Sequence, residues 1–329
     1  MHALGDAVGA PHERIGKRGA ISLDAYTGVV SEPIIRNSRW QGRRVSVVGQ
    51  ITDDHEMLCA LLQSILTNDG TYAPDNAALA YMDLATNAKN PFLGKNTRAL
   101  FKSVKTLRGY RSRRKKIFAP GNPISQSNGA LMRSAPLAAL ATDDESDKAA
   151  RDDAGLSNPT PIAIDANRVY VRALRALLRG KDPLQVQAAA IDWSTVPAVR
   201  KVLQHARGTD KRDVGGASKG WVLHALWSAF RALSVLHATR SAQDTLDWVI
   251  CLGGDTDTNG AITGAIIGAH IGHAAMQQET RTLKNILIVL AADTTLGDFP
   301  RPPKYYSLGS QLSDSQFLAD RFEPIGPRN

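Results

Sequence analysis

Apolar residues recur at three- and four-residue spacing along most of the chain, which is the period of a helix with one buried face. After residue 56 the pattern is carried by Met57, Leu58, Leu61, Leu62, Ile65 and Leu66. The same spacing predicts further helices at 75–87, 96–107, 163–179, 197–207, 218–237, 243–251, 259–276 and 280–292. Residues 14–50 are irregular, apart from an apolar alternation at Val45, Val47 and Val48 that is compatible with a small strand.

Turn-rich segments at 120–123, 155–159 and 215–216 separate these helices. Residues 142–153 are so highly charged that they are expected to form an exposed loop, and three prolines indicate a non-helical tail over 297–329. No composition shift or repeat divides the chain. We therefore expect one all-α domain over residues 1–329, built from roughly ten helices.

Charge is distributed unevenly. The 329 residues include 40 Lys and Arg against 31 Asp and Glu, a formal net charge of +9. Eight of the basic residues and no acidic residue lie within 101–120. A basic patch of this kind attracts phosphates or nucleic acid, but a solvated basic loop explains it equally well.

Membrane and secretion signals are not visible in the sequence. No apolar run approaches the length of a membrane span, and the first residues do not form a secretory signal. The two cysteines, Cys59 and Cys251, cannot form a disulfide framework. We expect a cytoplasmic protein with reduced thiols and no membrane partner.

Acidic residues gather at two predicted helix starts. The first cluster is Thr52, Asp53 and Asp54, and the second is Asp255, Asp257 and Thr258. Capping a helix requires one side chain, so each cluster has more carboxylates than capping needs. If the two helix starts converge, the carboxylates need counter-cations, and such oxygen ligands suit two hard divalent ions.

Glycines in the second helix also suggest how it packs. Gly260, Gly264, Gly268 and Gly272 recur at every fourth residue and form one helical stripe. The absence of side chains along this stripe permits close approach of another helix. We therefore expect the second acidic cluster to lie at the start of a tightly packed, buried helix.

Five segments, taken together and in this order, resemble the ADP-ribosylglycohydrolases. They are residues 5–10 through Glu13, 49–54, 127–133, 220–222 and 253–258. The resemblance implies an orthogonal all-α bundle with two Mg²⁺ or Mn²⁺ ions in a cleft. It also implies a metal-dependent glycosidic-bond hydrolase, in which a metal-bound water attacks the ribose anomeric carbon and ADP-ribose leaves a modified protein or small molecule.

The resemblance also implies roles for individual residues. The metal ligands would be Thr52, Asp53, Asp54, Asp255, Asp257 and Thr258, and the catalytic residues would be Glu13, Asp54 and Asp257. The choice between Mg²⁺ and Mn²⁺ stays open, as does the acceptor from which ADP-ribose is removed.

A small turn at 127–130 is the candidate site for the substrate diphosphate. A glycine-containing turn that opens a helix presents backbone N–H groups to phosphate, and the resemblance places Ser127, Asn128, Gly129 and Ala130 there. Asn158 stands where several relatives have a substrate-contacting His, and its amide can still donate a hydrogen bond. The alternative to hydrolysis is a module of the same fold that binds ADP-ribose, or nucleic acid through 101–120, without turnover.

Overall fold

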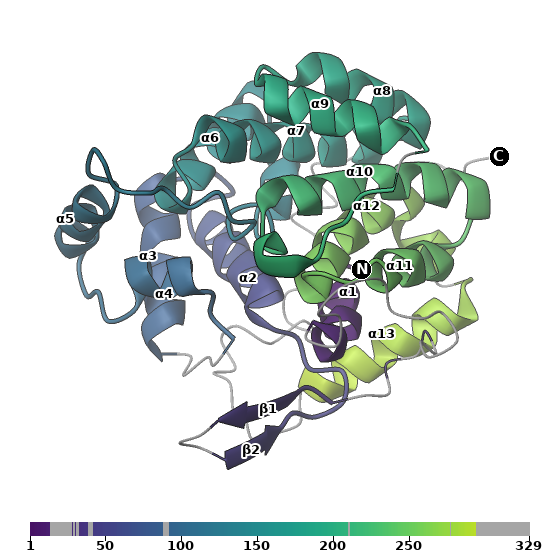
Figure 1. Cartoon of the computed structure of the whole chain (residues 1–329), viewed down its shortest axis with the longest axis horizontal. Coiled ribbons are helices and arrows are strands. Elements are labelled where there is room, and N and C mark those ends of the chain that lie inside the picture. Colours follow the sequence, from purple (N-terminus) through teal and green to yellow (C-terminus); the bar gives the residue numbers. More distant parts are fainter. Residues whose placement is uncertain are drawn as a thin grey trace.

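The structure is a computed structural model, and it describes residues 1–13, 28, 30, 33–38, 42–87, 92–209, 211–276 and 278–293. Within these ranges the architecture is all-α, as predicted, with thirteen α-helices and one small hairpin (Figure 1). The hairpin pairs β1 (Ile35–Ser38) with β2 (Gly42–Val45) in antiparallel register, Ile35 opposite Val45. No described helix has the length and apolar character needed to cross a membrane.

The helices follow the chain in this order: α1 (His2–Gly9), α2 (Asp53–Leu66), α3 (Pro74–Asn87), α4 (Lys95–Phe101), α5 (Leu107–Ile117), α6 (Asp143–Ser157), α7 (Pro161–Leu178), α8 (Pro183–Trp193), α9 (Pro197–Arg207), α10 (Val222–Thr239), α11 (Ala242–Cys251), α12 (Thr256–Met276) and α13 (Thr280–Asp293). Short 3₁₀ turns lie at Ala10–His12, Ala135–Ala139 and Gly216–Ser218.

Helix α12 lies at the centre of the bundle and packs against α1, α7, α10 and α11. Its partner α10 is buried over most of its length, and Trp227 and Phe230 are among the largest fully buried side chains. Tyr170 of α7 donates from its hydroxyl to the Ile262 carbonyl of α12 at 2.8 Å. Burial of this apolar surface supplies the main driving force for assembly, and it holds the start of α12 in a fixed place.

The glycine stripe of α12 is the contact surface for α1, as the spacing predicts. A Cβ atom on Gly5 would lie 2.0 Å from the Gly260 carbonyl oxygen, and one on Gly9 would lie 2.2 Å from that of Thr256. A Cβ atom on Gly264 would likewise lie 2.3 Å from the Met1 carbonyl oxygen. Gly272 does not continue the stripe, because its backbone is non-helical (φ 76°, ψ 170°) and kinks α12.

Three expectations about individual segments are wrong. Residues 142–153 form most of α6 rather than a loop. The Thr142 hydroxyl accepts from Glu145 N while the Glu145 carboxylate accepts from Thr142 N, a complete capping box. The helix expected at 96–107 ends at Phe101, and α5 and α8 were not predicted. The turn at 127–130 continues as further turns into the Ala135–Ala139 3₁₀ helix and opens no α-helix.

Other expectations stay predictions. The tail at 297–329 lies outside the described residues, as do 14–27 in the segment expected to be irregular. The single-domain organisation over 1–329 and the cytoplasmic location stay predictions as well.

Candidate active site

The start of α2 is held by a buried acid from α1. Asp6 is fully buried and accepts hydrogen bonds from the Thr52 N–H at 2.9 Å, the Thr52 hydroxyl at 2.8 Å and the His55 N–H at 3.1 Å. Thr52 is the N-cap of α2, and its hydroxyl also lies 3.1 Å from an Asp54 carboxylate oxygen. These bonds fix the first turn of α2, which carries Asp53 and Asp54.

The start of α12 is held by the end of α1 and by the loop before it. The Thr256 hydroxyl donates to the Gly9 carbonyl at 2.7 Å. Gly254 has φ +79°, and a Cβ there would lie 2.3 Å from the Val214 carbonyl oxygen, so the turn that aims Asp255 requires glycine. Asp257 accepts from the Thr258 N–H at 2.9 Å. The first turn of α12 is thereby oriented toward α1.

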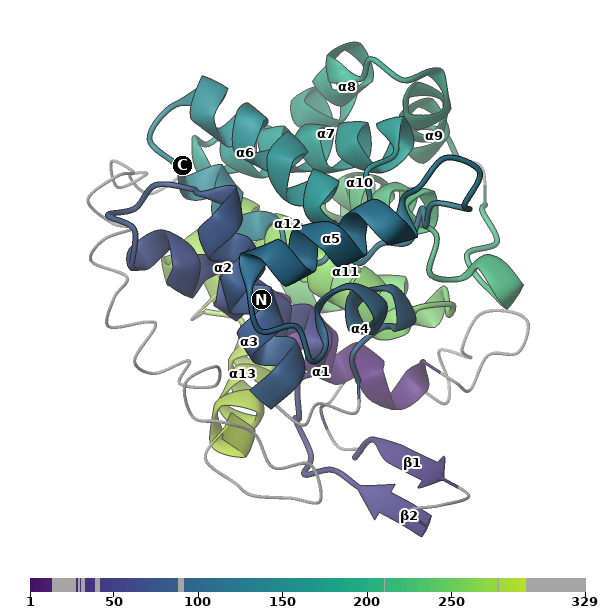
Figure 2. The ribbon, with the colours of Figure 1, turned by 90° about the vertical axis from the view of Figure 1, so that its left-hand side faces the viewer.

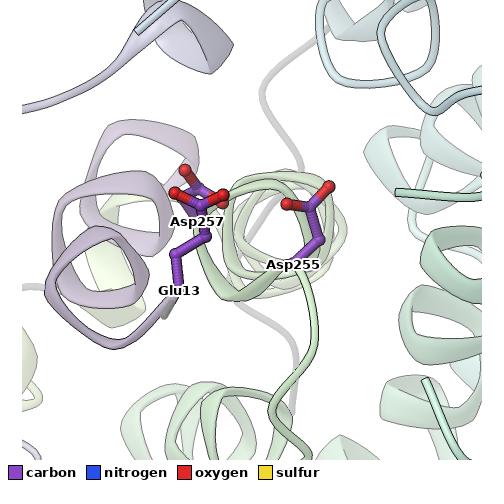
Figure 3. A group of neighbouring side chains, drawn as sticks. All are labelled: Glu13, Asp255 and Asp257. Atoms are coloured by element: carbon purple, nitrogen blue, oxygen red, sulfur yellow. The ribbon is translucent and has the colours of Figure 1, made fainter. Parts of the chain in front are cut away.

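Acids from both helix starts converge, together with Glu13 from just beyond α1. Glu13, Asp255 and Asp257 each offer a carboxylate oxygen, and these oxygens lie within 4.8 Å of one another (Figure 3). In the same view the Glu13 carboxylate lies against that of Asp257, with Asp255 to the side. Asp54 joins them electrostatically, because Asp257 is the strongest charged influence on its titration.

Burial and mutual repulsion disfavour the ionised form of these acids. Burial, followed by the charge of Asp257, raises the pKa of Asp54 well above its usual range. Burial, followed by the charge of Glu13, does the same to the pKa of Asp257. The pKa of Asp255 is also raised, mainly by burial, although the Asn128 amide partly offsets this by donating to it at 2.6 Å. A bound cation would reverse both effects.

One atom of the cluster tests whether a cation fits. Asp54 Oδ1 is buried and, among the described residues, receives no hydrogen bond. Buried carboxylate oxygens are normally satisfied by donors or metals. This oxygen and the carboxylates of Glu13, Asp255 and Asp257 therefore make up the kind of donor set that a hard divalent ion prefers.

A lysine lies at the edge of the cluster. Lys219 Nζ donates to Glu13 Oε1 at 2.9 Å and to the Glu13 carbonyl at 3.3 Å. Burial alone would lower the pKa of Lys219, but the hydrogen bond and charge of Glu13 raise it, with smaller contributions from Asp255 and Asp257. The ammonium group therefore stays charged and partly neutralises the outer side of the cluster.

The acids form one wall of a cavity of about 550 Å³. Of the residues predicted for the site, those that line it are Glu13, Asp53, Asp54, Ser127, Asn128, Gly129, Asp255, Asp257 and Thr258. Thr52, Ala130 and Asn158 are almost fully buried and do not line it. Most of the predicted set thus lines one space large enough for a nucleotide-sized ligand.

A family model of the ADP-ribosylglycohydrolases matches residues 2–298 of the chain. The chain belongs to the ADP-ribosylglycohydrolase family. This match confirms the resemblance seen in the sequence. Members of the family hydrolyse ADP-ribose linkages.

The fold of the chain is also similar to a solved structure described as an "ADP-ribosylglycohydrolase-related protein complex". The TM-score is 0.60 at 22% sequence identity, over 88% of this chain and 95% of that chain. A comparison with curated proteins finds no match. The structural likeness supports the ADP-ribosylglycohydrolase fold.

Asn158 reaches the cavity only through the loop that lines it. Its amide nitrogen donates to the Ser125 carbonyl at 3.2 Å and to the Ser127 carbonyl and hydroxyl at 3.3 and 3.2 Å. Its amide oxygen accepts from the Ser157 hydroxyl at 2.8 Å. The structure therefore places Asn158 behind the wall, holding the loop, rather than inside the cavity.

The turn itself is positioned by a residue that sequence reasoning did not assign to the site. Arg133 is fully buried, donates to the Gly129 carbonyl at 3.0 Å and forms an ion pair with Asp153 at 2.9 Å. Within the described part of the chain, the Gly129 and Ala130 N–H groups donate to no protein acceptor.

Asp6 and Lys219 are the other positioning residues that were missed. Asp6 lies inside the segment 5–10 that carries the family resemblance, so its motif was a usable signal. Lys219 precedes the 220–222 motif, but nothing in the spacing indicates that it reaches Glu13.

Proposed function

We propose that this protein is a divalent-cation-dependent hydrolase that removes ADP-ribose from a modified protein side chain or small molecule. The bond cleaved joins the acceptor to the anomeric carbon of the ribose. One observation carries the proposal: Glu13, Asp255 and Asp257 meet, beside the unpartnered oxygen of Asp54, in a cavity of an ADP-ribosylglycohydrolase chain.

The oxygen donors fit two Mg²⁺ or Mn²⁺ ions. Asp53, Asp54, Asp255, Asp257 and Thr258 line the cavity and would hold them, with Thr52 supporting this set from the α2 N-cap. When bound, the ions would supply positive charge that orients the ribose hydroxyls and lowers the pKa of a water molecule.

The chain's own carboxylates supply the proton acceptors. In hydrolysis a water oxygen bonds to the anomeric carbon, and the acceptor atom leaves with a proton. Glu13, Asp54 and Asp257 face the space where that water must lie, so they are the candidate catalytic residues. Lys219 donates to Glu13 Oε1, so its ammonium group would compete with a bound ion for this carboxylate.

The turn at 127–130 is the proposed seat of the diphosphate. Gly129 lines the cavity, and its N–H, which donates to no acceptor among the described residues, suits an anion. Asn128 joins this turn to Asp255 through its 2.6 Å hydrogen bond, so the anion-binding and acidic parts of the cavity are fixed relative to each other. Asn158 contributes by holding Ser125 and Ser127.

A release assay tests the proposal. Peptides carrying ADP-ribose on arginine or serine are incubated with Mg²⁺ or Mn²⁺, with and without a chelator. We expect wild type to release ADP-ribose only without chelator, and Asp257→Ala to lose at least about 1000-fold in kcat/KM, because the variant lacks a charge that stabilises the transition state.

The matched control is Asp192→Ala, which removes an exposed carboxylate from α8 that makes no ion pair among the described residues. Wild-type activity is expected in this variant. If no substrate releases ADP-ribose while ADP-ribose still binds, the hydrolase proposal is wrong and the binding module without turnover replaces it.

A further inference from the structure

The segment from residue 101 to 120 forms a strongly basic surface on α5 and the turn before it. Its cations are Lys102, Lys105, Arg108, Arg111, Arg113, Arg114, Lys115 and Lys116. Among the described residues, only Arg111 meets a carboxylate, that of Asp75 at 2.5 Å, and both partners are well exposed. Arg113 and Arg114 donate to main-chain carbonyls instead, which leaves their charge unneutralised.

Helix α5 is nevertheless held firmly in place. The Thr106 hydroxyl caps it by accepting from the Gly109 N–H at 3.1 Å. On its inner face, the Tyr110 hydroxyl donates to the Leu156 carbonyl at 2.7 Å, and Arg114 donates to the Gly155 carbonyl at 2.7 and 3.2 Å. The segment is therefore a fixed helix anchored on α6, rather than the solvated loop that was its alternative interpretation.

The same anchors connect α5 to the wall of the cavity. Residues 155 and 156 lie just before Asn158, whose amide holds the loop at 125–127. Both segments that flank α5 in sequence line the cavity, Lys95 to Ala99 on one side and Pro123 to Ser125 on the other. The six peptide links from residue 117 to residue 123 span at most about 20 Å. Figure 2 shows α4 and α5 on the same side of the molecule.

The exposed charge of this surface, and its lack of exposed large apolar side chains, favour a nucleic acid over a membrane as its binding partner. A helix that lies on a membrane needs a wide apolar face, but none of the exposed large apolar side chains in the described part of the chain belongs to α5. The distance from Arg108 to Lys116 along the helix axis is about 12 Å at 1.5 Å per residue. A nucleic-acid strand presents a phosphate roughly every 3.4 Å of axis, so several phosphates fall within reach of the exposed cations.

We infer that α5 docks a nucleic-acid strand beside the cavity, and that the acceptor freed of ADP-ribose is carried by that strand. This inference rests on the proposed function. In the reaction, the bond between the ribose anomeric carbon and the acceptor atom of the strand breaks, the water oxygen bonds to that carbon, and the acceptor atom leaves with a proton.

Docking is tested first, with unmodified DNA. Binding of a fluorescent single-stranded oligonucleotide is measured by anisotropy from about 50 to about 200 mM salt. The test variant combines Arg108→Gln, Lys115→Gln and Lys116→Gln, three exposed cations without an ion pair among the described residues. We expect at least tenfold weaker binding and a salt slope reduced by about three.

The control variant removes three other exposed cations, through Lys201→Gln, Arg207→Gln and Lys211→Gln in and after α9. It changes the net charge equally, so it should retain most of the affinity. Equal loss in both variants overturns docking on α5. Competition by polyglutamate as effective as that by DNA also overturns it, in favour of an acidic protein partner.

The acceptor is tested with an oligonucleotide that carries ADP-ribose on one base, beside an ADP-ribosylated peptide. We expect the α5 variant to raise KM for the oligonucleotide about tenfold, with kcat and peptide hydrolysis unchanged. Hydrolysis of the peptide but not of the oligonucleotide overturns the acceptor assignment and leaves the proposed function intact. Binding of DNA without release from any substrate overturns the proposed function and retains the docking surface alone.

Discussion

Asp153 and Asp54 are both deeply buried, but the chain surrounds them differently. Asp153 receives the Arg133 guanidinium at 2.9 Å and the Tyr81 hydroxyl at 2.7 Å, and Arg133 also stacks over the Tyr81 ring. Asp54 has one oxygen without any donor among the described residues, and the charges nearest to it are other carboxylates. One buried acid is neutralised by the chain, and the other is not.

The difference distinguishes an acid that stabilises the fold, Asp153, from an acid that we expect to bind a cation, Asp54. Leaving a buried charge unpaired costs several kcal/mol. A buried acid that serves only the packing of the core is therefore expected to have a partner in the chain, as Asp153 of α6 has in Arg133. Asp54 has an oxygen without a donor among the described residues, so a counter-charge from outside the chain would stabilise its ionised form. Glu13 is intermediate, since Lys219 neutralises it from the outer side only.

The largest effect is expected where the internal partner is removed. Arg133→Met leaves Asp153 buried and unpaired, and should lower the free energy of unfolding by about 3–5 kcal/mol in urea titrations. Adding Asp153→Leu should recover much of this loss, because it removes the orphaned charge. The control is Arg111→Met on the exposed pair with Asp75, with a cost below about 1 kcal/mol. Equal costs for the two pairs would contradict the comparison.

The second effect concerns the unpaired acids and should have the opposite sign. Asp54→Asn removes a crowded carboxylate, so in chelator it should raise the free energy of unfolding by about 1–2 kcal/mol. Wild type should instead gain about 2.7 kcal/mol from Mn²⁺ at a hundredfold excess over its Kd, a gain that the variant loses. Thermal unfolding with and without Mn²⁺ measures both, and Asp192→Asn serves as the control.

The pH dependence of the same pair of proteins sharpens this test. The pKa of Asp54 is raised in the folded state, so its ionisation is easier in the unfolded chain. Its contribution to stability is present at low pH and is lost as pH rises through the folded pKa. In chelator, the advantage of Asp54→Asn over wild type should therefore grow as pH rises from about 4. An advantage that is constant with pH would contradict a raised pKa.

The smallest effect is expected at Lys219. Lys219→Met removes a cation that competes for Glu13, so Mn²⁺ should bind the metal-free protein about threefold more tightly by titration calorimetry. Lys211→Met, which removes another exposed cation of the same inter-helix segment, should leave affinity unchanged. Weaker binding in Lys219→Met would mean that the ammonium orients Glu13 for the ion instead of competing with it.

Local signals predicted helices that have a clear apolar stripe, whether or not a side chain caps them. The start of α2 has an N-cap at Thr52 and a periodic apolar face, and α9 was predicted with its observed bounds. Helix α6 was misread because its first turn is almost entirely charged, although Thr142 and Glu145 already form a capping box in the sequence. Helix α5 was missed because Tyr110 is its only buried residue.

The sequence indicated most of the predicted residues that line the cavity, but it did not indicate their positions relative to one another. Two acidic motifs indicated where charge accumulates, but no local pattern measures the distance between segments so far apart in sequence. The position of Asn158 behind the wall depends on how α6 meets the loop at 125–127, and the reach of Lys219 to Glu13 depends on tertiary packing alone.

The direct backbone contact of α1 with α12 also has a consequence for the order of assembly. Gly5 and Gly9 fit against Gly260 and Thr256, so α1 cannot make this contact until α12, far later in the sequence, has been synthesised. Contacts this distant in sequence slow folding and delay it until most of the chain exists. Divalent ions should accordingly bind only after α12 has been synthesised and has packed against α1, so ion binding would report on this long-range contact rather than aid early folding.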